Sequence, residues 1–179
     1  MKDPIVGGHP IHAVMTDVPI GAIVATVVFD LISLITRSPS WLFAAQASVA
    51  LALVSGIAAA FVGVWDYMAV PKTHPVRSIG AQHGLLNTLA LLFIAASVGL
   101  RFATGNAVII GQVLSLVALG VFGLTGWLGG EMIYKLGWRV TPAEYAEQLE
   151  ADLRAHGETA RIAKAHEPVD QYERSHKLL

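Results

Sequence analysis

The chain has 179 residues, of which 54% are hydrophobic and 14% are charged, and its formal net charge is −1. This composition indicates that lipid surrounds most of the chain, and the balanced charge excludes the basic surface that nucleic-acid binding requires. Because the sequence contains no cysteine, it also excludes disulfides, thiolate metal sites and haem attached through cysteines.

Four stretches are long and apolar enough to cross a bilayer, which takes roughly 20 residues each. They are residues 14–35, 42–70, 83–102 and 108–133. The first is too long for the apolar core of a signal peptide, so we expect it to stay in the protein. Short connections make neighbouring helices antiparallel. The sequence therefore predicts an all-α integral membrane protein, a four-helix up-down bundle in direct contact with the lipid bilayer.

Basic residues near the helix ends predict the orientation of the bundle, because cytoplasmic loops are enriched in Lys and Arg. Arg37 and Arg101 are the basic residues at one side of the membrane. More lie on the side that holds both termini: Lys2, Lys72, Arg77, Lys135 and Arg139. We therefore expect both termini to be cytoplasmic.

The expected domain organisation has three parts: an N-terminal cytoplasmic segment (1–13), a transmembrane domain (14–138) and a cytoplasmic region (139–179). In the last part, Thr141 and Glu144 have the spacing of a helix capping box around a proline. The sequence predicts an amphipathic helix after this cap and a loosely ordered tail beyond it.

Small residues recur at four-residue intervals, as Ala59 and Gly63 in one span and Gly126 and Gly130 in another. Such pairs let helix backbones approach closely where lipid supplies no hydrophobic drive. Packing within one bundle is the favoured interpretation, and homodimerisation through Gly126 and Gly130 is the alternative.

Ionisable residues concentrate at the cytoplasmic ends of the expected helices, and an ionisable residue within a span suggests function. Because the helix directions alternate, residues far apart in sequence reach the same level. The layer consists of His9, His12, Asp17, Asp66, His83 and Glu131, with Asn87 as an expected interhelical donor. A shared ligand site and a purely structural hydrogen-bond network both fit this pattern.

The opposite end holds one polar or charged residue from each helix: Asp30, Gln46, Arg101 and Gln112. We expect Asp30 and Arg101 to form a structural ion pair, since a buried charge in a membrane needs a partner.

Neutral histidines and carboxylates are ligands for divalent metals, and haem b requires only one or two axial histidines and an apolar slot. The leading hypothesis is therefore a haem b or a non-haem metal ion at His9, His12 and His83, serving membrane electron transfer. In this hypothesis Asp17, Asp66 and Glu131 are direct ligands or hold the ligands in place. One alternative is an intramembrane metal-dependent hydrolase, and another is a subunit or scaffold whose polar layer only locks the helices.

The segments Gly8-His9-Pro10-Ile11-His12 and Asp17-Val18-Pro19-Ile20-Gly21 resemble the opening of a bacterial membrane-protein family, domain of unknown function 2231. Asp66, the segment from His83 to Asn87 and the stretch 126–131 are similar to that family's later polar positions, and Ala13 stands where the family has a second proline. The resemblance covers residues 7–137. It implies a four-helix protein of the bacterial inner membrane. Because relatives occur with Rieske or cytochrome-type domains, it also favours electron transfer with a separate redox partner protein.

Overall fold

The computed structural model describes residues 5–6, 9–102, 106–138, 151 and 154–155. The chain divides into two compact units, Met1–Trp138 and Arg139–Leu179. In the second unit Ala151, Arg154 and Ala155 are helical. The capping box at Thr141 and Glu144 and the tail after residue 155 lie outside the described residues.

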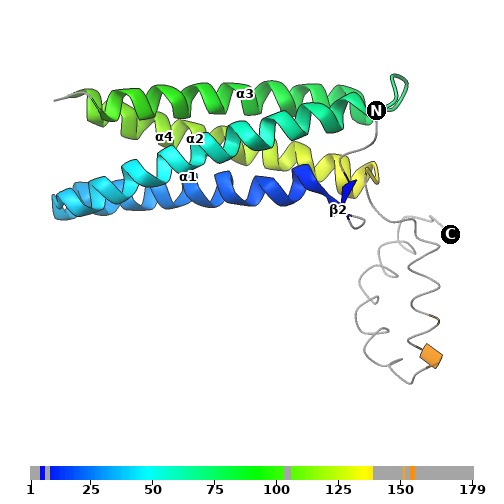
Figure 1. The fold of residues 1–179 in the computed structure, drawn as a ribbon, viewed down its shortest axis with the longest axis horizontal. Coiled ribbons are helices and arrows are strands. Elements are labelled where there is room, and N and C mark those ends of the chain that lie inside the picture. Colours follow the sequence, from blue (N-terminus) through cyan, green and yellow to red (C-terminus); the bar gives the residue numbers. More distant parts are fainter. Residues whose placement is uncertain (1–4, 7–8, 103–105, 139–150, 152–153, 156–179) are drawn as a thin grey trace, which may run out of the picture. The chain divides into compact units, whose positions relative to one another are not determined.

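The first unit contains four long helices that run antiparallel in chain order (Figure 1). A short antiparallel pair precedes them, with Ile5 of β1 opposite Pro10 of β2. The elements are β1 (Ile5–Val6), β2 (His9–Pro10), α1 (Ile11–Thr36), α2 (Pro39–Met68), α3 (Val76–Arg101), α4 (Asn106–Gly130) and a final π-helical turn, η1 (Glu131–Lys135). Each of the four long helices is long and apolar enough to cross a membrane. The predicted all-α membrane bundle is therefore confirmed.

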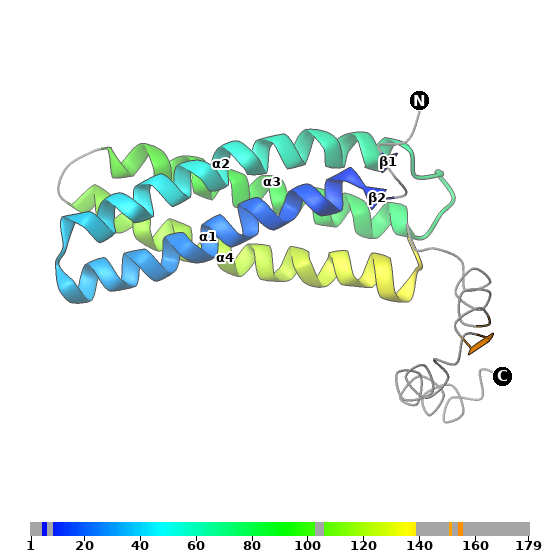
Figure 2. The ribbon, with the colours of Figure 1, turned by 60° about the horizontal axis from the view of Figure 1, so that its bottom comes forward.

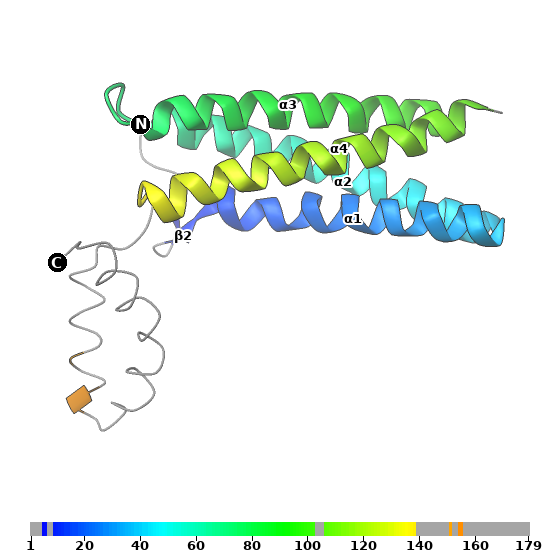
Figure 3. The same cartoon turned by 180° about the vertical axis from the view of Figure 1, so that it is seen from behind.

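The helices pack as two hairpins lying side by side (Figure 2, Figure 3). α1 packs most extensively on α2, and α3 on α4, while contacts of α2 with α3 and of α4 with α1 close the ring. This arrangement places α1 and α3 at diagonal corners, so that side chains from these two helices can meet at the centre of the bundle.

The interior is built mainly from small residues, while large apolar residues lie outside. Ala52, Ala90 and Ala118 are completely buried, whereas Phe61 is 75% and Leu85 71% exposed. Lipid is as apolar as a protein core, so close backbone packing rather than hydrophobic burial holds such helices together.

All four long helices begin earlier than the hydropathy of the sequence suggested, and the starts of α1 and α3 matter for the site. α1 begins at Ile11, directly after Pro10 in an extended conformation, and α3 begins at Val76, directly after Pro75. Proline lacks a backbone N–H, which the first helical turn does not need, so it fits at these starts. His12 consequently lies in the first turn of α1 and His83 lies two turns inside α3.

Candidate functional site

His12 and His83 face one another at the centre of the bundle, at the end where α1 and α3 begin. Their ring centroids are 6.3 Å apart and their ring planes are nearly perpendicular, at 89°. Both side chains are partly buried. The two histidines come from diagonal helices, so this contact links the two hairpins. We call these residues the histidine pair.

Each ring of the histidine pair is held by a backbone carbonyl of the other helix in its hairpin. Nδ1 of His12 lies 3.0 Å from the oxygen of Ala59 in α2, and Nδ1 of His83 lies 2.9 Å from the oxygen of Thr125 in α4. A carbonyl oxygen can only accept, so Nδ1 must carry the hydrogen in both rings. In the neutral imidazoles the free electron pair is therefore on Nε2, the atom that remains available to bind a ligand.

A glycine lies beside each histidine ring. A Cβ atom added at Gly63 would lie 2.7 Å from Cε1 and 2.9 Å from Nδ1 of His12. A Cβ added at Gly129 would lie 3.7 Å from Cε1 of His83, an ordinary contact. The position of the His12 ring against α2 therefore requires glycine at residue 63.

The other residues expected at this site are placed differently. His9 is exposed in β2, and Asp17 is exposed on α1 beyond its first turn, where the sequence had suggested a first-turn acid. Glu131 forms an ion pair with Lys135 one turn later, and Asp66 is partly buried near the end of α2. Within the described part of the chain, no group of three or more His, Asp or Glu residues is arranged to hold a metal ion.

We had expected Asn87 to bridge two helices, but it does not. Its Nδ2 donates to the backbone oxygen of His83 at 3.0 Å, which is a bond within α3. The reason is geometric: residues four apart lie on the same helix face, so the short amide side chain reaches its own backbone first.

The connection between α2 and α3 covers this end of the bundle with cation–π and ring contacts. The guanidinium of Arg77 lies 4.8 Å from the ring centroid of Tyr67 and donates to the oxygen of Val70 at 2.8 Å. The ring of His74 lies 5.3 Å from that of Trp138, and its Nδ1 accepts from a backbone N–H. His74 is therefore engaged by Trp138 and by a backbone N–H near the start of α3.

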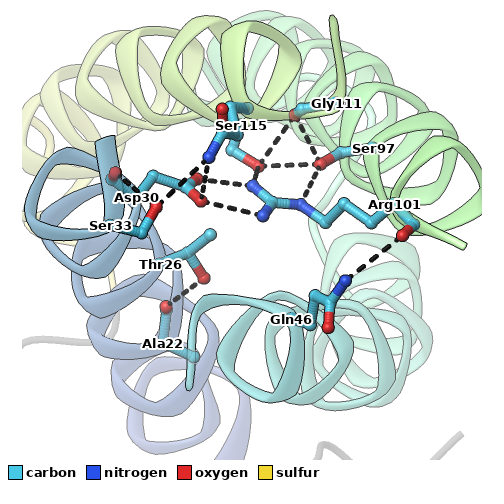
Figure 4. A network of polar contacts seen from close by, with 10 residues as sticks. Ala22, Thr26, Asp30, Ser33, Gln46, Ser97, Arg101, Gly111 and Ser115 are labelled. Atoms are coloured by element: carbon cyan, nitrogen blue, oxygen red, sulfur yellow. Dashed lines mark hydrogen bonds and ion pairs between the residues drawn. The ribbon is translucent and has the colours of Figure 1, made fainter. Parts of the chain in front are cut away.

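At the opposite end, Asp30 of α1 and Arg101 of α3 form a buried ion pair (Figure 4). Nη1 and Nη2 of Arg101 lie 2.8 and 2.5 Å from the two carboxylate oxygens of Asp30. The pair expected from the sequence is thus present, and it is bidentate.

Amides and hydroxyls from the remaining helices complete this polar cluster. Gln112 of α4 donates to Asp30 at 3.2 Å, and Gln46 of α2 donates to the backbone oxygen of Arg101 at 3.2 Å. Nε of Arg101 donates to the hydroxyl of Ser97 and Nη2 to that of Ser115, both at 3.1 Å. Every buried polar side-chain atom in the described residues has a hydrogen-bond partner. This cluster is therefore a fully hydrogen-bonded network that links the helices to one another.

The serines of this cluster were not predicted from the sequence, although the sequence holds a signal for them. Each serine lies one helical turn from a charged or amide residue of the cluster: Ser33 after Asp30, Ser97 before Arg101 and Ser115 after Gln112. Residues three or four apart share a helix face. A hydroxyl at this spacing from a membrane-buried charge is therefore a usable signal.

Residues 8–142 match the family described as predicted membrane protein, DUF2231. The match covers most of the chain, and the chain belongs to this family. It confirms the resemblance seen in the opening His-Pro motif. No curated protein and no solved structure matches the chain.

Proposed function

We propose that this protein binds haem b between His12 and His83 and carries electrons in the bacterial inner membrane. The observation that supports the proposal is the histidine pair itself: two rings on diagonal helices, 6.3 Å apart, each with Nδ1 bound to a backbone carbonyl. The hydrogen bond at Nδ1 leaves Nε2 as the ligand atom, which is the usual way in which proteins orient histidine ligands.

The separation of the rings is compatible with both histidines holding one iron ion. Metal–nitrogen bonds to histidine are about 2.0–2.1 Å long, so two rings bound on opposite sides of one ion have centroids roughly 6 Å apart. The 6.3 Å separation of His12 and His83 agrees with this value. Gly63 and Gly129 lie beside the two rings and add no side chain there.

The set of available ligands favours haem over a non-haem metal ion. A protein-bound zinc, iron or manganese ion commonly uses three or four protein ligands, whereas haem b needs only its axial ones. Among the described residues no group of three or more His, Asp or Glu residues is arranged to hold a metal ion, and Glu131 is engaged by Lys135. The same point weighs against a metal-dependent hydrolase.

When bound, haem b supplies one-electron transfer between donor and acceptor. His12 and His83 would hold it, and the carbonyls of Ala59 and Thr125 would fix the tautomers of the two rings. We propose a separate redox protein as partner and, from the Lys and Arg distribution, a cytoplasmic location of both termini and of the histidine pair. A homodimer through Gly126 and Gly130 belongs to the same proposal.

Absorption spectroscopy of the full chain, expressed with haem supply and purified in detergent, tests this proposal. We expect a Soret band, and a sharp α band after reduction, with loss of both in His12→Ala and in His83→Ala. His74→Ala is the matched control, because His74 lies in the loop and should leave the spectrum unchanged.

Three results would contradict haem binding by the pair. The first is a wild-type protein without a Soret band even after haemin titration, and the second is normal haem content in His12→Ala. The third is a stoichiometric non-haem metal in elemental analysis. If His12→Ala and His83→Ala lower thermal stability while no cofactor is bound by any form, the histidine pair is a structural lock.

A further inference from the structure

We infer that the four-helix unit is a tandem duplication of one helical hairpin, and that each copy supplies an equivalent half of the histidine site. A shift of 71 residues, the separation of Asp30 and Arg101, carries α1 onto α3 and also His12 onto His83. A shift of 66 residues carries α2 onto α4, with Gln46 on Gln112 and Gly63 on Gly129.

The buried positions of the two hairpins coincide under these shifts. Each buried residue of α2 has a buried counterpart in α4: Ala45 and Gly111, Val49 and Ser115, Ala52 and Ala118, Gly56 and Phe122, Ala59 and Thr125. The same holds for most of the interior of α1 and α3: Pro19 and Ala90, Ile23 and Ile94, Thr26 and Ser97, Asp30 and Arg101. The two hairpins thus share most of their burial pattern, together with His12 and His83, Gln46 and Gln112, and Gly63 and Gly129 at equivalent positions.

The contacts across the bundle also have two-fold character. In an isologous pair, a residue on the two-fold axis touches its own equivalent. His12 faces its equivalent His83, and Asp30 pairs with its equivalent Arg101. In each helix these two residues are separated by 18 positions, or about 27 Å of helix. The axis of the duplication therefore runs through both polar centres.

Contacts away from the axis are reciprocal. Gln112 of the second hairpin donates to the side chain of Asp30, and its equivalent Gln46 donates to the backbone oxygen of Arg101. Such i-to-j and j-to-i contacts are what an isologous interface produces. The two equivalent amides thus contact the two equivalent residues, one at its side chain and the other at its backbone.

The duplication defines two equivalent half-sites at the histidine pair. One consists of His12, the carbonyl of Ala59 and Gly63, and the other of His83, the carbonyl of Thr125 and Gly129. In both, the glycine follows the residue that supplies the accepting carbonyl by one helical turn. A ligand on the axis would be held by one nitrogen from each half-site. The identity of that ligand as haem rests on the proposed function, and Gly63 and Gly129 become positioning residues for it.

The charges at residues 30 and 101 fit the same scheme. A pair of identical hairpins would place two like charges together on the axis, where burial makes repulsion strong. With Asp in one copy and Arg in the other, each hairpin pairs only with its counterpart. The two copies have thus diverged to Asp30 and Arg101, and this difference replaces repulsion between like charges by attraction.

A charge exchange tests the equivalence of the two copies without any cofactor. Asp30→Arg and Arg101→Asp alone should each lower the thermal midpoint of the full chain strongly. The double exchange should recover more than half of that loss, because Thr26 then lies one turn before the guanidinium, as Ser97 does now, and Gln46 takes the place of Gln112. Recovery should stay incomplete, because the equivalent of Ser115 is Val49, which cannot accept a hydrogen bond from the exchanged guanidinium. A double variant as unstable as the single variants would overturn the duplication.

Glycine substitutions test the half-sites through the haem spectrum and the thermal midpoint together. Gly63→Ala should reduce haem content at least several-fold, because the new Cβ takes the space of the His12 ring. In the second half-site Gly129→Ala should be tolerated, whereas Gly129→Val should displace His83 and have the same effect. Gly84→Ala is the control, since a Cβ there meets no atom within 4 Å.

The outcomes separate this inference from the proposed function. If the wild type binds no haem, the proposed function fails, and the charge exchange still decides on the duplication. If the wild type binds haem and Gly63→Ala, folded with an unchanged midpoint, binds it equally well, the half-sites are wrong while haem binding stands.

Discussion

Asp30 and Arg101 bind each other through both carboxylate oxygens and both terminal guanidinium nitrogens, and their side chains are only 6% and 1% exposed. Removing two charges from water is costly, and their attraction repays the cost only when the remaining donors and acceptors are satisfied as well. Here Ser97, Ser115 and Gln112 satisfy them. Removing one partner of this pair should therefore lower the free energy of unfolding strongly.

Removing one partner should cost more than removing both. We expect Arg101→Leu to lower the free energy of unfolding by about 3–5 kcal/mol, because it leaves a buried carboxylate unpaired. The double variant Asp30→Leu/Arg101→Leu should be more stable than this single variant. Unfolding in mixed detergent micelles, followed by circular dichroism, measures both.

Arg37→Gly is the control for loss of a positive charge at the same end of the bundle. Arg37 is exposed and has a φ of 53°, a left-handed conformation that glycine adopts easily. Its replacement should leave stability unchanged or slightly raised. A double variant no more stable than Arg101→Leu would show that the cost does not come from the unpaired carboxylate.

Loss of the Ser97 hydroxyl should destabilise the protein although no charge is removed. This oxygen accepts from Nε of Arg101, donates to the oxygen of Gly111 at 2.6 Å and lies 2.8 Å from the hydroxyl of Ser115. Ser97→Ala leaves a buried N–H of Arg101 without its acceptor, at a cost of about 1–3 kcal/mol. The double variant Ser97→Ala/Ser115→Ala should lose less stability than the sum of the two single variants, since the hydroxyls share one network.

Ser55→Ala is the matched comparison, because the hydroxyl of Ser55 only donates to the oxygen of Leu51 in its own helix. Its effect should stay within about 0.5 kcal/mol. Equal effects of Ser97→Ala and Ser55→Ala on the unfolding midpoint would contradict a special role of the buried network.

The fold could be predicted from the sequence because four apolar stretches of spanning length leave few alternatives in a membrane. The helix starts could not, because hydropathy counts only apolar residues. The first two turns of α3 contain Arg77 and Gln82, which are compatible with a helix near the membrane surface but lower its apolar score. The histidines were therefore assigned to helix starts and loops instead of the helices that position them.

The candidate site could be predicted only in part. Polar residues at one level of the bundle were recognisable, but level alone does not say which side chains point inward. Asp17 lies five residues after His12 in α1, about 140° around the helix, and is exposed while His12 turns inward. The duplication was hidden for a similar reason: few residues besides His12 and Gly63 are identical in the copies, and the equivalence lies in burial and contacts.

Two glycines of α4 should respond oppositely to alanine. A Cβ at Gly111 would lie 3.1 Å from the backbone oxygen of Ser97 and 3.2 Å from Cγ of Arg101, and a backbone atom cannot move without shifting α3. We expect Gly111→Ala to cost about 1–3 kcal/mol through overpacking. At Gly120 a Cβ meets nothing within 4 Å, so Gly120→Ala should gain about 0.5–1 kcal/mol from helix propensity. Shifts of the unfolding midpoint in the same direction for both variants would contradict the helix contact seen at Gly111.

Gly126 tests whether the outer face of α4 forms a homodimer. Within the bundle, a Cβ at Gly126 meets no atom within 4 Å, whereas one at Gly130 lies 3.7 Å from the Tyr134 ring of the same chain. Gly126→Leu should therefore leave the monomer folded with its new side chain in lipid. If two chains pack through this glycine, the leucine keeps their backbones apart and the dimer fraction falls in crosslinking experiments on proteoliposomes. Gly99→Leu on α3, which is equally open, is the control. Equal dimer fractions in the two variants would end the proposal of a dimer through Gly126.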